Sequence, residues 1–341
     1  MNETKGHVYV QTNDAKANEI VVYRRGTDGR LERLGSYLTG GRGSGEPHLQ
    51  SQSSVLVSEG RVFVTNAGSD ELTVFAVRGD ELVAIDRVAS GGSAPRSVAV
   101  HEDHVYVLNT GDRPSLTGFG LANDELEPIE GGSLALGDGT DPAQAAFAPD
   151  GLLLLVTDRA LDAIHLVQLD ESRRVVGVSS QSSSGATPYG FDVRADGTVV
   201  VTEAAGAQVG KASTSSYRLH GGRGLELVSG AVRNTRSEVC WAVITNDGRT
   251  AFVTNFADGT ISSYAIDEDG SITLRDAVAA TTVDGVPGIR DEALSGDGRF
   301  LYALHADTGS VYGWEVQSDG TLTAIGAANG LPLTAAGLAA S

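Results

Sequence analysis

A short strand-like cassette recurs along this chain and constrains its fold more than any other feature. Between Ser53 and Val77, three apolar runs rich in β-branched residues are separated by turn formers, a pattern typical of consecutive antiparallel strands. The second run, VFVTN at 62–66, has six counterparts: VYVQTN at 8–13, VYVLN at 105–109, LLVTD at 154–158, VVVTE at 199–203, AFVTN at 251–255 and LYALH at 301–305.

The spacing of these copies predicts a β-propeller. From Asn66 onward, the last residues of successive copies are 43, 49, 45, 52 and 50 positions apart. A period of this length with several short strands per repeat is typical of propeller blades. Seven copies therefore predict an all-β fold, a seven-bladed β-propeller of four-stranded antiparallel blades that forms a single domain over residues 1–341.

The two ends of the chain are predicted to close the ring together. The first copy has no apolar run before it to serve as an innermost strand, whereas every later copy has one. A run of the missing kind, TAAGLAAS at 334–341, stands at the other end of the chain. Because a closed ring leaves no unpaired strand edges, we expect this run to pair with the first copy.

Charge and hydropathy exclude several classes of partner. The formal net charge is −19, with only three lysines among the 25 basic residues, so the acidic surface repels nucleic acid and anionic lipid. No apolar run approaches the roughly 18 residues of a membrane span, and we expect a soluble monomer. The strand pattern begins at Val8, which predicts a cytoplasmic protein; a secreted protein whose signal peptide has been removed would look the same.

Polar residues are expected to gather at the mouth of the central channel. One set ends the second strands and another precedes the inner strands, so both sets surround one end of the channel. The first set is Thr12 or Asn13, Asn66, Asn109, Asp158, Glu203, Asn255 and His305, and the second includes Gln52, Arg96, Gln144, Tyr189, Glu238, Arg290 and Asp291. Asn and Asp after a strand are also common turn caps, and a packing histidine is an open alternative for His305.

The repeats FVTNAGSDELTVFAV at 63–77 and FVTNFADGTISSYAI at 252–266 resemble those of lactonase-type seven-bladed propellers. That family includes 6-phosphogluconolactonases and carboxymuconate-lactonising enzymes (carboxymuconate cyclase-like proteins), and it borders on the YVTN-repeat propellers. The resemblance implies a His, two Arg and a Glu around the channel mouth. Glu203 matches the acidic residue, whereas DPAQ at 141–144 replaces the His, ATPYG at 186–190 replaces Gly-Pro-Arg-His, and Phe256 stands where an Arg is expected.

Two functions follow as hypotheses. The first is a lactonase-like enzyme, a hydrolase or lactonising cyclase, that hydrolyses or forms a small carboxylated lactone without a metal or other cofactor. Carboxylates and imidazoles act as bases, and arginines bind anionic groups. The predicted catalytic residues are Glu203, His305 and Glu238, and the predicted substrate-binding residues are Arg96, Arg236, Arg290, Gln144 and Tyr189.

The second hypothesis is a non-catalytic propeller that binds a protein, a glycan or a small ligand. A variant of the enzyme hypothesis places a divalent ion over the channel. Carboxylate and amide oxygens suit calcium, provided that they converge on one point. Its ligands would be Glu203, Asp158, Asn109 and Asn255.

Overall fold

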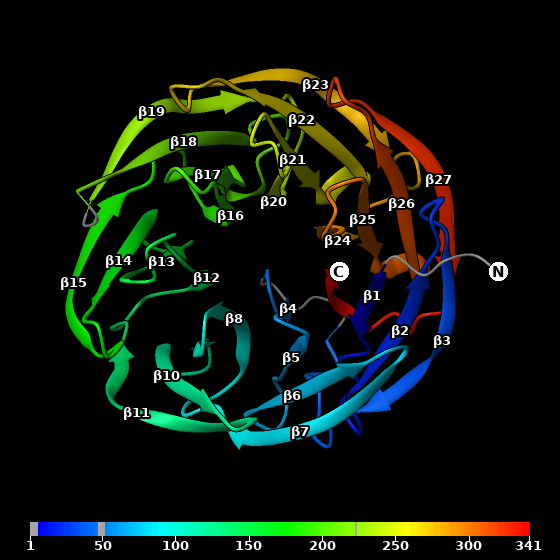
Figure 1. Cartoon of the computed structure of the whole chain (residues 1–341). Helices are drawn as coiled ribbons and strands as arrows, with labels where there is room; N and C mark the ends of the chain where they lie inside the picture. Colours follow the sequence, from blue (N-terminus) through cyan, green and yellow to red (C-terminus); the bar gives the residue numbers. More distant parts are fainter. Residues whose placement is uncertain (1–5, 47–51, 222–223) are drawn as a thin grey trace.

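Seven antiparallel four-stranded sheets stand in a ring around a central channel in the computed structural model of the protein (Figure 1), which describes residues 6–46, 52–221 and 224–341. Within each sheet the strands run in chain order from the hub to the rim, except that the last strand, β28, is the inner strand of the first blade. The predicted seven-bladed propeller is therefore confirmed. We number the blades 1 to 7 in chain order, so that blade 1 holds β28 and β1–β3.

The two strands nearest the hub in each blade are short. The inner strands are β28 (Ala336–Ala340), β4 (Val55–Ser58), β8 (Pro95–His101), β12 (Pro142–Phe147), β16 (Pro188–Val193), β20 (Val239–Ile244) and β24 (Ile289–Leu294). The second strands are β1 (Gly6–Gln11), β5 (Arg61–Asn66), β9 (His104–Asn109), β13 (Leu153–Asp158), β17 (Thr198–Glu203), β21 (Thr250–Asn255) and β25 (Phe300–His305).

The two outer strands of each blade complete the wheel. The third strands are β2 (Glu19–Arg25), β6 (Glu71–Arg78), β10 (Ser115–Ala122), β14 (Ala163–Leu169), β18 (Ser213–His220), β22 (Thr260–Ile266) and β26 (Ser310–Val316). The outermost strands are β3 (Leu31–Leu38), β7 (Glu81–Ala89), β11 (Glu125–Ala135), β15 (Val175–Ser182), β19 (Gly224–Arg233), β23 (Ile272–Thr281) and β27 (Leu322–Asn329).

Apolar side chains fill the spaces between neighbouring blades. The second strands are buried on both faces, as in β13, whereas outermost strands such as β15 alternate between half-buried and exposed residues. One cluster joins Leu155 of blade 4 to Phe191 and Tyr217 of blade 5. Each such side chain contributes about 1.5–3 kcal/mol on burial, so the blades stabilise one another around the ring.

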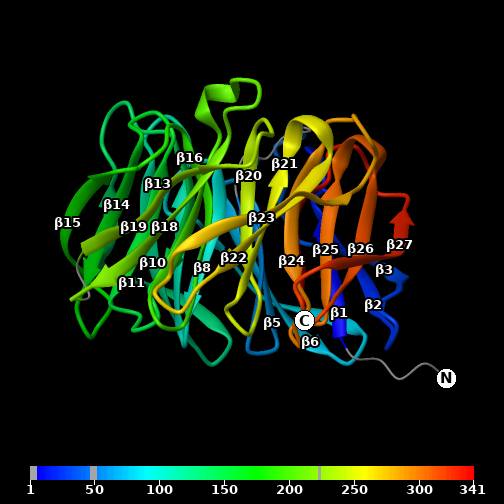
Figure 2. The same ribbon diagram turned by 90° about the horizontal axis from the view of Figure 1, so that it is seen from above.

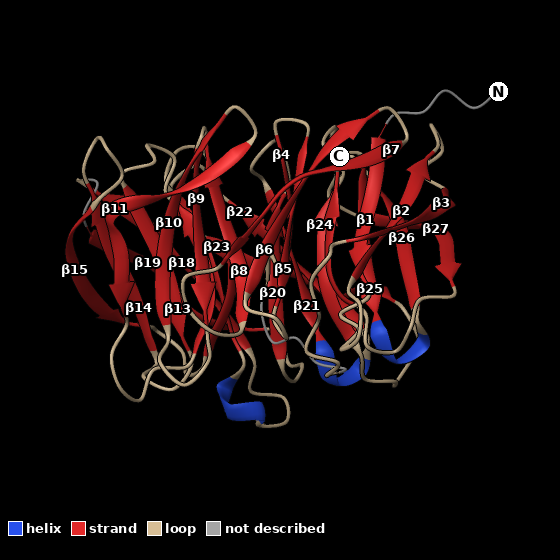
Figure 3. Ribbon diagram, turned by 90° about the horizontal axis from the view of Figure 1, so that it is seen from below, coloured by secondary structure: helices blue, strands red, loops and turns tan. Residues whose placement is uncertain are grey.

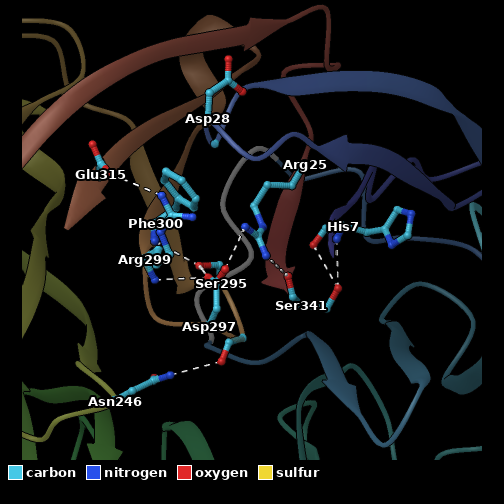
Figure 4. A network of polar contacts seen from close by, with 12 residues as sticks. His7, Arg25, Asp28, Asn246, Ser295, Asp297, Arg299, Phe300, Glu315 and Ser341 are labelled. Atoms are coloured by element: carbon cyan, nitrogen blue, oxygen red, sulfur yellow. Dashed lines mark hydrogen bonds and ion pairs between the residues drawn. The ribbon is translucent and has the colours of Figure 1, made fainter. Parts of the chain in front are cut away.

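The C-terminal strand closes the ring as predicted. Strand β28 pairs antiparallel with β1, with Val8 opposite Ala340 and Val10 opposite Leu338. Arg25 is 1% exposed beneath this junction, where its Nη2 donates to the main-chain oxygen of Ser341 at 3.3 Å and its Nη1 lies 3.3 Å from Asp297 Oδ2 (Figure 4). The closure is therefore held by a strand pair and by a buried guanidinium.

The two faces of the propeller differ in the elements that they carry. Three short 3₁₀ helices, η1 (Ala205–Ala207), η2 (Phe256–Asp258) and η3 (Ala306–Thr308), lie on one face (Figure 3), each within two residues of the end of a second strand. The chain ends on the opposite face, as the view in Figure 2 also shows. Within the described residues, no helix has the length and apolar character needed to cross a membrane.

Candidate functional site

A repeated backbone contact builds the helix-bearing face. Thr187 and Glu238 directly precede inner strands and have left-handed backbones, with φ of 59° and 54°. Their carbonyls accept hydrogen bonds from the N–H groups of Ala204 at 2.9 Å and Phe256 at 3.0 Å, the first residues after the second strands. Arg159 makes the same contact in blade 4, from its N–H to the carbonyl of Asp141 at 3.0 Å. The two chain segments at each blade tip are thereby held side by side.

These tips surround a cavity of about 720 Å³, which we call the cup. Blades 4 to 7 form most of its wall, and the loop ahead of blade 2 adds Glu46. Its wall includes Arg159, Tyr189, Glu238, Trp241, Phe256 and Arg290. A cavity of this size accommodates a small organic ligand.

Arg159 is fixed on one wall of the cup. Its Nη2 lies 2.6 Å from Asp141 Oδ1, and its Nη1 donates to the Tyr189 hydroxyl at 2.8 Å. The guanidinium carbon also lies 4.8 Å from the centroid of the Tyr189 ring, a cation–π distance. Tyr189 in turn meets the edge of Trp241 at a centroid distance of 5.0 Å. A charged group and two rings thus form one rigid wall.

Arg290 forms a second guanidinium–aromatic pair. Its guanidinium carbon lies 4.8 Å from the centroid of the Phe256 ring, and its Nη2 lies 3.2 Å from Asp307 Oδ1. Arg290 is only 7% exposed, and burial lowers its pKa although Asp307 opposes the shift. A guanidinium remains charged at neutral pH even so. The cup therefore holds two positive charges in fixed positions.

Glu238 and Cys240 are two further ionisable groups that line the cup. Within the described part of the chain, the Glu238 carboxylate forms no hydrogen bond or ion pair, whereas the Glu238 carbonyl accepts a hydrogen bond from the Phe256 N–H. Burial raises the pKa of Cys240 to about 12, so the thiol remains protonated and is a poor nucleophile. Glu238 is consequently the better placed of the two to accept a proton in the cup.

Glu203 and His305, the two other predicted catalytic residues, do not line the cup. Both are fully buried. The Glu203 carboxylate accepts hydrogen bonds from the hydroxyls of Ser213 and Ser215 at 2.6 Å each, from the Gly185 N–H at 2.8 Å and from a further serine, Ser183, at 3.2 Å. His305 Nε2 lies 3.3 Å from the carbonyl oxygen of Val286. Their catalytic roles stay predictions, and the geometry gives both a role in holding a blade tip together.

The predicted substrate-binding residues divide between the cup and its surroundings. Tyr189 and Arg290 line the cup. Arg96 lies 3.8 Å from Glu46 and Arg236 lies 3.3 Å from Asp258, and neither is part of the cup wall. The amide of Gln144 bonds the backbone N–H and carbonyl of Phe191, at 2.7 and 3.0 Å, and joins blade 4 to blade 5.

Two cup residues outside the predicted site, Arg159 and Phe256, lie one position further along the chain than predicted ones. Asp158 and Asn255 end second strands and are fully buried, whereas the next residues, Arg159 and Phe256, line the cup. Successive side chains of a strand point to opposite sides, so a shift of one residue exchanges the buried set for the cup set. The alternation of side chains along the strands could therefore have pointed to Arg159 and Phe256.

A second cavity of about 410 Å³ occupies the central channel and is lined by the inner strands. Its wall includes three carboxyl groups, and burial raises the pKa of Asp192 to about 6, that of Asp291 to about 8 and that of Glu292 well above its usual range. Both Glu292 carboxyl oxygens lack a hydrogen-bond partner among the described residues. At neutral pH Asp291 and Glu292 are therefore held largely as neutral acids, whereas Asp192 is mostly ionised.

The divalent-ion variant gains no support from this arrangement. No group of three or more His, Cys, Asp or Glu side chains that could hold a metal ion occurs in residues 6–46, 52–221 and 224–341. Of the predicted ligands, Asp158 pairs with His165 at 3.0 Å and Glu203 is bonded by serines in its own blade. Each of these two carboxylates already has close hydrogen-bond partners.

Fold and site together define a seven-bladed propeller with a ligand-sized cup at one end of its channel. The chain belongs to the family described as lactonase, 7-bladed beta-propeller, whose sequence profile matches residues 3–115 and 201–324. The expected family is thereby confirmed. The profile matches the stretches that contain Glu203, Glu238, Phe256 and Arg290.

Solved structures with the same fold span nearly the whole chain. The periplasmic gluconolactonase PpgL of Pseudomonas aeruginosa superposes with a TM-score of 0.75 at 15% identity, covering 98% of each chain. A protein from Lactobacillus plantarum gives 0.79 at 15% identity over 98% of this chain and 99% of its own. A candidate 6-phosphogluconolactonase from Bacteroides fragilis gives 0.75 at 16% identity over 98% and 97%. No match was found among curated proteins.

Proposed function

We propose that the protein hydrolyses or forms a small lactone in the cup. The observation that carries this proposal is that one cavity holds the carboxylate of Glu238 together with the guanidinium groups of Arg159 and Arg290. Membership of the lactonase family supports the same reaction class. A base and fixed positive charges are the two elements that acyl transfer to water requires.

The proposed hydrolysis uses Glu238 as a general base. The carboxylate accepts a proton from water as the water oxygen bonds to the lactone carbonyl carbon. The developing oxyanion is stabilised by the guanidinium of Arg290 or Arg159. The ring C–O bond then breaks, and the proton passes to the departing alkoxide, which leaves a hydroxy acid. Lactone formation follows the same path in reverse.

The carboxyl group predicted on the substrate also belongs to this proposal. Arg159 and Arg290 are the cup residues able to bind it, because Arg96 and Arg236 lie outside the cup wall. Tyr189 holds Arg159 in place through its hydroxyl, at 2.8 Å from Nη1. We therefore assign Tyr189 a positioning role.

The proposal is tested by titrating lactone opening with purified protein. A panel of γ- and δ-lactones is assayed with and without a chelator, comparing wild type with Glu238→Gln. Removing a general base typically lowers the rate 10²–10⁴-fold. The matched control is Glu127→Gln, an exposed residue on the outermost strand of blade 3. Unchanged turnover in Glu238→Gln contradicts the assignment of the base.

A non-catalytic binding role is the second candidate. The other two carboxylates of the cup are paired, Asp141 with Arg159 and Glu46 with Arg96. Because Glu238 then has no second acid or base to assist it among the described wall residues, this pairing favours the binding role. Absence of turnover across the panel, with a ligand still bound, supports this alternative.

A further inference from the structure

Three aromatic rings shape the cup. Tyr189 comes from β16, Trp241 from β20 and Phe256 from η2, so three chain segments each contribute one ring. Tyr189 and Trp241 meet at an interplanar angle of 67°, an edge-to-face pair. Ile289 and Ala207 add further apolar surface. Walls of this kind fit a flat ring better than a ligand covered in hydroxyl groups.

The positive charges of the cup are already offset. Arg159 pairs with Asp141, and Arg290 pairs with Asp307. Among the described lining residues there are three carboxylates, Glu46, Asp141 and Glu238, against two guanidinium groups. A phosphate dianion placed here would meet a net negative surrounding, which opposes its binding. A neutral ligand meets no such barrier, and a ligand with a single carboxylate meets a smaller one.

The hydroxyl groups on the described wall are few, and each already accepts a hydrogen bond. The hydroxyl of Tyr189 accepts a hydrogen bond from Arg159, and that of Thr187 accepts one from the Gly206 N–H at 3.0 Å. A polyhydroxylated ring would therefore find few partners for its hydroxyls, and each hydroxyl buried without a partner weakens binding. An aromatic ring needs no such partners.

We propose that the cup selects a lactone whose body is an aromatic ring and which carries no phosphate, rather than a sugar lactone. That the ligand is a lactone rests on the proposed function. That its body is aromatic is inferred from the geometry of the cup. Phe256 and the Tyr189–Trp241 pair are the residues that determine this specificity.

Binding and turnover are measured separately so that the two proposals can fail independently. Binding is measured by calorimetry with hydrolysis-resistant lactams: 3,4-dihydro-2(1H)-quinolinone as the aromatic probe and glucono-δ-lactam as the sugar probe. We expect the aromatic lactam to bind at least tenfold more tightly. Phe256→Leu keeps apolar bulk but removes the ring, and it should weaken the aromatic lactam up to about tenfold, the range of an aromatic pair. The control is Tyr37→Leu, on the outermost strand of blade 1.

Each outcome decides one proposal. Equal binding of the two lactams, preference for the sugar lactam, or no binding of the aromatic lactam overturns the inference. If the aromatic lactam binds but dihydrocoumarin, the matching aryl lactone, is not hydrolysed, the inference stands and the proposed activity falls. If glucono-δ-lactone is hydrolysed faster than dihydrocoumarin, the activity stands and the aromatic specificity falls.

Discussion

Gln52 and Ala242 hydrogen-bond to each other across the hub of the propeller. The Gln52 amide donates to the carbonyl of Ala242 at 2.9 Å and accepts from its N–H at 3.3 Å, although the two residues belong to blades 2 and 6. A Cβ on Gly190 would come within 2.5 Å of the Gln52 amide oxygen and 2.9 Å of the Trp241 ring. Gln52 therefore lies behind Trp241 of the cup wall, on the side that faces the central channel.

We predict that Gln52→Ala destabilises the protein by about 1–3 kcal/mol, because it leaves a buried backbone N–H and carbonyl of blade 6 without partners. The free energy of unfolding from urea titration measures the effect. Gln181→Ala, on the outermost strand of blade 4, is the control. A change below about 0.5 kcal/mol in Gln52→Ala would show that the contact across the hub does not support the ring.

Glu203→Gln is predicted to reduce stability and leave catalysis intact in the folded protein. The substitution replaces an acceptor of four hydrogen bonds by an amide, whose N–H₂ then faces donor groups, at a cost of about 1–3 kcal/mol. Urea unfolding and kcat, both measured at a temperature where the variant is folded, separate the two effects. A 10²-fold loss of kcat with unchanged stability would restore Glu203 as the catalytic base.

The buried acids of the channel predict a pH-dependent stability. Asp291 and Glu292 have raised pKa values in the folded protein, so the folded state binds more protons than the unfolded state above about pH 4. The free energy of unfolding should therefore fall as pH rises from about 4 to 8, by on the order of 1 kcal/mol per pH unit for each group that remains protonated. Asp192, the other acid facing Glu292, acts in the same direction up to about pH 6.

Glu292→Gln checks this directly, because the amide does not titrate. Melting temperatures should match those of the wild type near pH 4 and exceed them at pH 8. Glu127→Gln is again the exposed control. A variant that is less stable than the wild type at pH 8 would mean that Glu292 is ionised and has a stabilising partner.

Arg25→Met is predicted to weaken the closure of the ring. It removes the guanidinium that joins Ser341 to Asp297, and Asp297 is 33% exposed, so the loss should lie at the lower end for a buried ion pair, about 2–3 kcal/mol. Arg30→Met, whose side chain is 76% exposed, is the control. Equal unfolding free energies for the two variants would contradict the role of Arg25.

The sequence predicted the seven-bladed ring well, but it predicted the residues of the cup only in part. The fixed period and the unmatched run at 334–341 determined the blade number and the pairing of β28 with β1, because both follow from local strand patterns. Glu238 and Arg290 were found because Glu238 directly precedes an inner strand and Arg290 is the second residue of one. Arg159 was missed because Asp158, the last strand residue, was taken as the one at the mouth.

Contacts between blades and between strands could not be predicted from the sequence pattern of a single repeat. The bond from Gln52 to Ala242 depends on the diameter of the hub, which only the assembled ring fixes. The burial of Glu203 among serines depends on Ser213 and Ser215 of the neighbouring strand, and β18 is the one third strand with serine at both of these positions. The positions that follow strands therefore predicted where the cup lies. Which of the residues there line the cup depends on the direction of each side chain.

The crystal structure of the protein with the more tightly bound of the two lactams tests the central claim most directly. We predict that the lactam lies in the cup, between Phe256 and Tyr189, with its carbonyl oxygen within hydrogen-bond distance of Arg290 or Arg159 and its carbonyl carbon facing Glu238. A lactam bound in the channel beside Glu292, or on the face that carries the C-terminus, would contradict the assignment of the cup as the functional site.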